Sequence, residues 1–225
     1  MYSILIEGLE NGKSLNELLN DFKTKAKEFS FCLERIAIEV YYLKEQQTSL
    51  EHAISEIQPK WDQAKKSFTN IMWDYLMKIN KRYKNIEPSR ILVKIREKVC
   101  EMYDVSYKNW WFFQESYFNR LSFYSVDTEI DDLCNKKFVI LDLLVAKMKK
   151  SKYFEKCKCE ETLRIYRWAL AFYDLICKNA QLSLLTKILK LVSREILLKQ
   201  SNISNLNKER ERIEKFIIKM QIQDF

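Results

Sequence analysis

Apolar residues recur at a fixed spacing along the first third of the chain. Steps of seven from Leu15 reach only apolar residues: Leu15, Phe22, Phe29, Ile36, Leu43, Leu50, Ile57, Ala64 and Ile71. A second series, offset by four residues, is apolar except at Gln47: Leu19, Ala26, Leu33, Val40, Gln47, Ile54, Trp61, Phe68 and Tyr75. Two apolar positions in each heptad are typical of a coiled-coil seam, so we predict long helices that pack along one stripe.

A helix-start signal lies immediately before this pattern. The Ser14 side chain can accept a hydrogen bond from a free backbone N–H of the first turn, and Glu17 can reach back to the N–H of Ser14. This arrangement is a capping box. We therefore expect a long helix to begin there, after a short lead-in over residues 1–13.

Two features inside the seam predict a break in the helix. Thr48 and Glu51 repeat the capping-box spacing beside the polar seam position Gln47. Pro59 would remove one backbone hydrogen bond from an uninterrupted helix. We expect the first helix to end near Gln46 and a second to begin at Thr48, with a break at Pro59 as the alternative.

The second half of the chain carries further helical signals. A start signal occupies residues 125–128, and the aromatic residues of 110–118 suit helix or dimer packing, or insertion into a membrane. The polar stretch 200–205 is expected to separate a third long helix from a shorter terminal helix at about 205–221. Apolar spacings of three and four define one face of that third helix: Tyr166, Leu170, Tyr173, Cys177, Ala180, Leu184, Ile188 and Leu191.

Composition supports the same fold class. Only two of the 225 residues are glycine and only two are proline. Tight turns and chain reversals rely on these residues, so the low counts favour a few long helices. We predict an all-α fold in one elongated domain over residues 1–225. The sustained seam further predicts a homodimer whose monomer is not independently stable.

The sequence carries no motif of a known catalytic or cofactor site. It lacks the phosphate-binding glycine loops, the zinc-protease helix and the serine nucleophile turn, so we expect no enzymatic activity and no cofactor. His52, the single histidine, suits a surface or capping role. Of six scattered cysteines only Cys157 and Cys159 lie close together, which falls short of a zinc site, and we expect reduced structural thiols.

The N-terminal segment MYSILIEGLENGK lacks the basic flank and the long apolar region of a signal peptide. No stretch of the chain reaches the ~18 uninterrupted apolar residues of a membrane-spanning helix. We therefore expect a cytoplasmic protein that is at most peripheral at a membrane.

Positive charge is concentrated in particular segments. The net charge is +8, and residues 78–98 hold eight lysines and arginines but only two acids. Such a cluster attracts an anionic lipid surface or nucleic acid. Four further lysines lie within residues 147–152. The candidate lipid-binding residues are Lys78, Lys81, Arg82, Lys84, Arg90, Lys94, Lys147, Lys149, Lys150 and Lys152.

Two segments resemble the F-BAR family of membrane-binding helical dimers. Residues 8–45 are similar to its N-terminal signature, with Ile38 and Glu39 at the family's Ile-Glu pair and Tyr42 at its tyrosine; the phrase reads Glu34-Arg35-Ile36-Ala37-Ile38-Glu39-Val40-Tyr41-Tyr42-Leu43. Residues 48–86 look like the start of that family's second long helix. The match covers roughly residues 8–86.

The resemblance implies an antiparallel dimer of elongated helical bundles. Its basic concave face would bind anionic phospholipid and sense or generate membrane curvature, and its partners would be endocytic or cortical cytoskeletal proteins. Residues 31–51 would then pack against the chain's own long helices and against the second subunit. The charge pattern alone leaves two alternatives open: a helical nucleic-acid-binding protein and a coiled-coil assembly protein without a ligand.

Overall fold

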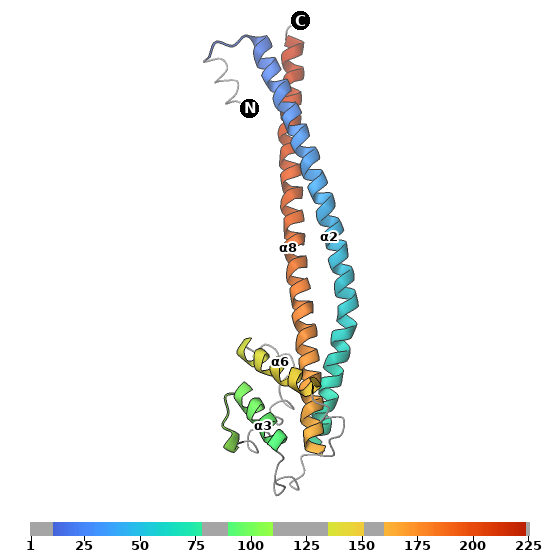
Figure 1. Ribbon diagram of the computed structural model, residues 1–225. Coiled ribbons are helices and arrows are strands. Elements are labelled where there is room, and N and C mark those ends of the chain that lie inside the picture. The colour runs from blue at the N-terminus through green and yellow to red at the C-terminus, as the bar shows by residue number, and fades with distance from the viewer. Residues whose placement is uncertain (1–10, 78–89, 110–134, 151–159, 224–225) are drawn as a thin grey trace. The chain divides into compact units, whose positions relative to one another are not determined.

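The computed structural model describes residues 11–77, 90–109, 135–150 and 160–223, and these parts are helical with no strand. The predicted all-α fold class is confirmed. Figure 1 shows the four α-helices; with one short 3-10 helix, the elements in chain order are α2 (Leu15–Met77), α3 (Arg90–Met102), η2 (Tyr107–Asn109), α6 (Asn135–Lys150) and α8 (Glu160–Gln223).

The chain divides into two compact units. Unit 1 comprises Met1–Ala53 and Leu185–Phe225, and unit 2 comprises Ile54–Leu184. Each of the long helices α2 and α8 has one segment in unit 1 and another segment in unit 2. None of the helices within the described ranges is long and apolar enough to cross a membrane.

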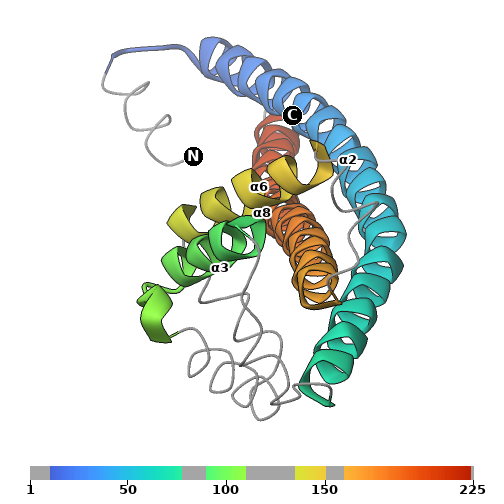
Figure 2. The same cartoon turned by 60° about the horizontal axis from the view of Figure 1, so that its bottom comes forward.

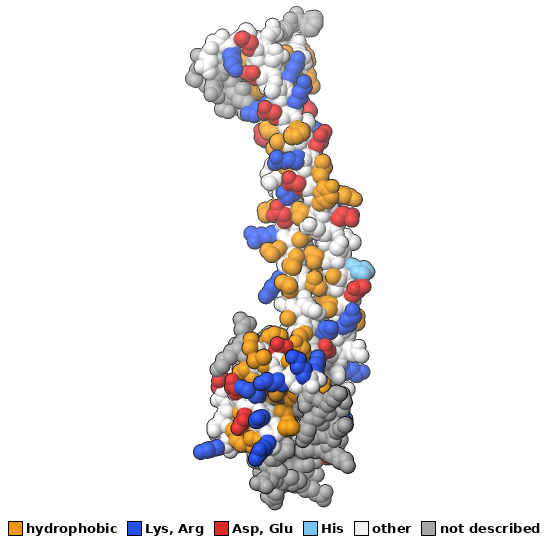
Figure 3. Space-filling model, viewed as in Figure 1, with side chains coloured by type: hydrophobic (Ala, Val, Ile, Leu, Met, Phe, Trp, Pro, Cys, Tyr) orange, Lys and Arg blue, Asp and Glu red, His pale blue; other side chains and the backbone are white. Residues whose placement is uncertain are grey.

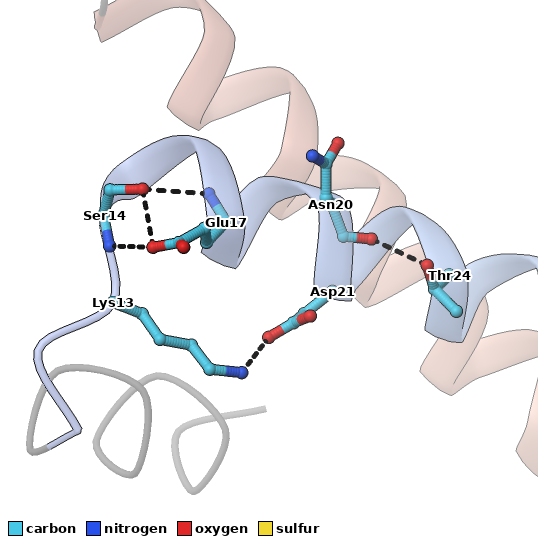
Figure 4. A network of polar contacts seen from close by, with 6 residues as sticks. All are labelled: Lys13, Ser14, Glu17, Asn20, Asp21 and Thr24. Carbon is cyan, nitrogen blue, oxygen red and sulfur yellow. Dashed lines mark hydrogen bonds and ion pairs between the residues drawn. The ribbon is translucent and has the colours of Figure 1, made fainter.

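The predicted capping box forms at the start of α2 (Figure 4). The backbone N–H of Ser14 donates to Glu17 Oε2 at 2.7 Å, and the N–H of Glu17 donates to Ser14 Oγ at 3.4 Å. These bonds lower the pKa of the Glu17 carboxyl below its ordinary value. The preceding Gly12 has a φ of 71°, a left-handed conformation that suits glycine and lets the chain turn into the helix.

The expected break near Thr48 is not present, because α2 is continuous from Leu15 to Met77 and contains Pro59. The Thr48 hydroxyl donates to the Lys44 backbone carbonyl at 3.1 Å, which is an in-helix bond and not a cap. Gln47 donates to Glu51 Oε1 at 3.1 Å along the helix. The apolar seam continues through this region, so helix packing outweighs the local capping signal.

The expected separation of a terminal helix at about 205–221 is also absent, since α8 runs unbroken through residues 200–205. Ile203 and Leu206 are half-buried, whereas the polar residues between 200 and 205 are exposed. The polar stretch therefore occupies the solvent side of a helix whose seam is maintained, and it does not interrupt the backbone.

Unit 1 is a pair of antiparallel helix segments from α2 and α8. Its buried centre consists of Leu18, Phe22, Ile213 and Met220. Phe22 packs edge-on against Phe216, with ring centroids 4.9 Å apart. The predicted α2 seam is confirmed, because every seam residue from Leu19 to Ile71 whose side chain is described is buried or half-buried.

The apolar face predicted for α8 is only partly correct. Tyr166 to Cys177 are half-buried on that face, but Ala180, Leu184, Ile188 and Leu191 are exposed. In this part of α8 the covered residues are instead on a neighbouring stripe, where Leu185, Leu189 and Val192 are half-buried and Ile196 is buried. Because α8 carries apolar residues on several stripes, the spacing of these residues alone does not show which stripe is buried.

Unit 2 has the larger core, built from α2, α3, α6 and α8. Phe68 of α2 stacks on Phe172 of α8 with ring centroids 5.1 Å apart, and both rings are fully buried. Helices α3 and α6 pack against each other (Figure 2). The sequence predictions for residues 110–118 and 125–128, and for Cys157 and Cys159, concern parts of the chain outside the described residues.

Candidate functional site

A groove lies between α3 and α6 in unit 2. It has a volume of about 310 Å³. Its walls combine an apolar floor with charged side chains on the rim: Ile91, Lys94, Ile95, Glu97, Lys98, Leu144, Lys147 and Met148. In Figure 3, Lys and Arg side chains gather among apolar ones over the part of unit 2 that contains α3 and α6.

The apolar spacing of α3 places its lysines on the rim. Leu92, Ile95 and Val99 are buried and anchor one face of the helix in the core. Lys94 and Lys98, one turn apart, are exposed on another face and line the groove. The sequence of α3 therefore fixes a row of cations along one wall.

Helix α6 forms the opposite wall in the same way. Leu144 and Met148 are buried and contribute to the floor of the groove. Lys147 is exposed at the rim, and it continues the helical row of Val139 and Leu143, which are 54% and 55% exposed. This wall presents apolar side chains next to a cation.

The charges on the rim are mostly positive. Among the described residues, none forms an ion pair with Lys94 or Lys147, whereas Lys98 pairs with Glu101. Glu97 is the acidic residue of the lining. Lys94 and Lys147 are therefore available to an anionic ligand.

Arg96 belongs to the same basic cluster in the sequence but has a different role. It is 4% exposed, and its Nε donates to Glu161 Oε1 on α8 at 3.1 Å. This buried ion pair ties α3 to α8 inside unit 2. Because its guanidinium is already engaged, Arg96 is unavailable to an external anion.

A second polar contact fixes α6 on α8. Hydrogen bonding with Asp142, and secondarily with Cys177, raises the pKa of Tyr173 to about 12. The Tyr173 ring stacks on Phe138 with centroids 6.0 Å apart, and Lys149 Nζ lies 5.7 Å from its centroid. Asp142 and Lys149 thus both interact with Tyr173, the first by a hydrogen bond and the second through the aromatic ring.

The predicted basic residues divide into two sets. Arg90, Lys94, Lys147, Lys149 and Lys150 are described and exposed, and the groove brings Lys94 and Lys147 together from separate helices. Lys78, Lys81, Arg82, Lys84 and Lys152 lie outside the described residues. Lys98 belonged to the predicted basic cluster of residues 78–98 but not to the candidate lipid-binding residues, although it lies one helical turn after Lys94, a spacing that points to the same face. The apolar floor was not predicted.

Neither a metal site nor a thiol centre is found in the described ranges, where no group of three or more potential metal ligands occurs. Cys32 and Cys177 are half-buried free thiols, and Cys100 is a buried one. Burial raises the pKa of the Cys100 thiol above its ordinary value, which favours the protonated form.

No family model and no curated protein sequence matches this chain. The resemblance to F-BAR domains therefore stays a prediction from the quoted residues.

Proposed function

We propose that this protein binds anionic membrane surfaces through the α3–α6 face, defined here as the groove rim residues Lys94, Lys98 and Lys147 with the adjacent Ile91, Val139 and Leu143. One observation carries the proposal: Lys94 of α3 and Lys147 of α6 line the same apolar-floored groove. Cations beside exposed apolar side chains suit the boundary between lipid headgroups and acyl chains.

The electrostatic part of the interaction follows from the exposed lysines. A Lys or Arg near an anionic leaflet contributes about 1 kcal/mol. Arg90 and Lys150 are exposed at the ends of the same two helices and can add to the attraction. The binding free energy should weaken as salt screens these charges.

The apolar residues favour a membrane over nucleic acid. Phosphodiesters would satisfy Lys94 and Lys147 equally well, but they offer no partner for Val139 and Leu143, which are more than half exposed. A lipid bilayer accepts both the charge and the apolar area.

The wider proposal follows the family resemblance. In it the protein is a homodimeric, non-enzymatic scaffold, peripheral at the cytoplasmic side of a membrane, that senses or generates curvature. Endocytic or cortical cytoskeletal proteins are its proposed partners. Binding of nucleic acid, or assembly without a ligand, are the competing outcomes of the experiment below.

The experiment is co-sedimentation with phosphatidylserine vesicles, compared with binding to duplex and single-stranded nucleic acid at the same salt concentration. The test variant is Lys94→Glu with Lys147→Glu. Its matched control is Lys27→Glu with Lys44→Glu, which makes the same charge change at two exposed lysines of unit 1. Circular dichroism should show equal helix content in all three proteins.

We expect the wild-type protein and the control to bind vesicles, and the groove variant to lose at least tenfold in affinity. This is the size expected when two favourable lysine contacts become repulsive. Equal binding by the folded groove variant would exclude the groove as the site. Tighter binding of nucleic acid than of vesicles would favour the nucleic-acid alternative.

A further inference from the structure

The groove between α3 and α6 has the size and the lining of a site for one small molecule. Its volume is about 310 Å³, and small-molecule sites in proteins measure roughly 300–1,000 Å³. Such sites are mostly apolar and carry a few polar groups that orient the ligand. The apolar floor and charged rim of this groove follow the same plan. A contact that involved only surface charges would have no use for the floor.

The floor of the groove offers contacts for hydrocarbon and none for a polar ligand. Ile95, Leu144 and Met148 form it, and all three are buried against the core of unit 2. Ile91, one turn before Ile95 on α3, is 38% exposed and extends the apolar lining toward solvent. None of these four side chains donates a conventional hydrogen bond. A ligand that covers the floor should therefore be apolar where it touches it.

The lining favours an extended chain over a bulky group. On α3 it runs from Ile91 to Lys98, which is two helical turns or about 10 Å along the axis. On α6 it covers one turn, from Leu144 to Met148. Met148 is unbranched and can change rotamer to fit an irregular neighbour. A volume at the lower end of the range for ligand sites suits one acyl chain and not two.

The rim adds charge complementarity for a single anionic group. Lys98 pairs with Glu101, whereas neither Lys94 nor Lys147 has an ion pair with any residue in the described ranges. Glu97 also lines the groove and would repel a ligand that carries several negative charges. Two lysines from opposite walls therefore match one phosphate.

We infer that the groove holds one acyl chain of an anionic phospholipid, whose phosphate is bound by Lys94 and Lys147. The chain packs on the floor and on Ile91. This inference deepens the proposed function, on which it rests for the class of ligand. Because the chain leaves one apolar surrounding for another, the gain in affinity for a bilayer comes from removing the floor of the groove from water.

The first test uses lysophosphatidic acids, which have one acyl chain and one phosphate. The octanoyl and decanoyl forms, kept below their critical micelle concentrations, are titrated into the full-length protein by isothermal calorimetry. We expect one lipid per protein chain and about tenfold tighter binding of the decanoyl form, because two more methylene groups are buried. Glycerol phosphate has the same headgroup without a chain and should bind at least a hundredfold more weakly than the decanoyl form.

The second test fills the groove without changing its charge. In Ile91→Trp the larger side chain takes up space beside the floor. Val139→Trp is the matched control, because Val139 is an exposed apolar residue of the same face that does not line the groove. We expect Ile91→Trp to bind the decanoyl lipid at least tenfold more weakly and Val139→Trp to bind it like the wild type. Helix content by circular dichroism must be equal in the three proteins.

The third test separates the headgroup contact from the chain contact. Lys94→Gln with Lys147→Gln should weaken the binding of both lysolipids at least tenfold. The ratio of the two affinities should stay at about ten, because the apolar floor is unchanged. A ratio that falls to one in this variant would show that the chain does not contact the floor.

Three further results would overturn the inference: no saturable binding of the decanoyl lipid, equal affinities of the wild type for the two chain lengths, and unchanged binding by folded Ile91→Trp. Co-sedimentation with phosphatidylserine vesicles distinguishes these failures from failure of the proposed function. Vesicle binding without lysolipid binding would reject the groove inference and leave the membrane proposal. Lysolipid binding without vesicle binding would reject the membrane proposal and leave the groove as a site for a single lipid.

Discussion

Lys199 of α8 donates a hydrogen bond to Glu39 of α2, with Nζ and Oε2 2.6 Å apart. Lys199 occupies a position of the α8 seam between the apolar residues Ile196 and Ile203, and its side chain is 24% exposed. The bond lowers the pKa of Glu39 and raises that of Lys199. A polar contact inside an apolar seam favours one register over others, so this pair helps to align the two helices.

This pair predicts a pH dependence of stability. Because the folded-state pKa of Glu39 is below its ordinary value of 4.5, its contribution to the free energy of unfolding is present above that pH and is lost as the pH falls through the lower folded value. In Glu39→Gln, this part of the decrease in the free energy of unfolding at acid pH should disappear. Urea unfolding between pH 3 and 6, relative to neutral pH, measures it.

Glu34→Gln is the control for this experiment, since Glu34 is an exposed glutamate on the same helix. If Glu39→Gln and the wild type lost the same free energy of unfolding at acid pH, the pair would not contribute to folding stability.

The buried ion pair of unit 2 predicts a large effect of a small change. Glu161→Gln should lower the free energy of unfolding by about 3–5 kcal/mol, because it removes the carboxylate charge that pairs with the buried Arg96 guanidinium. Replacing both partners, by Arg96→Met with Glu161→Leu, should recover most of this loss. A double variant as unstable as Glu161→Gln would contradict this account.

Two phenylalanines of α2 provide a matched comparison for unit 1. Phe22 is fully buried and Phe31 is 69% exposed. Phe22→Ala should cost about 3–5 kcal/mol of stability through the cavity that it leaves, whereas Phe31→Ala should change it by less than about 0.5 kcal/mol. Thermal and denaturant unfolding followed by circular dichroism give both values. Similar losses for the two variants would mean that Phe31 is covered in solution.

The basic cluster of residues 78–84 gives a prediction from sequence alone, since it lies outside the described residues. The change of Lys78, Lys81 and Arg82 to Glu should weaken vesicle binding by orders of magnitude if this segment faces the bilayer. Comparison with the groove variant separates the two possible sites. Unchanged binding by the folded triple variant would leave the groove, together with Lys147, Lys149, Lys150 and Lys152, as the basic surface in contact with lipid.

The sequence by itself determined the helical class and the seam of α2. Scarce glycine and proline indicated long helices, and the heptad pattern from Leu19 to Ile71 identified residues that the structure buries or half-buries. The capping box at Ser14 was equally predictable. The capping box joins residues three apart, and the helical repeat places seam residues on one face of α2, so both features leave a direct pattern in the chain.

Only the tertiary structure decided which competing local signals prevail. Packing along the seam keeps α2 helical at Thr48 and α8 helical at residues 200–205, where local preferences predicted breaks. It also decided which apolar stripe of α8 is buried, and it brought Lys94 and Lys147 to one groove while Arg96 turned inward to Glu161. These outcomes depend on contacts between distant segments, and the free energy of such contacts is not encoded in the spacing along any one helix.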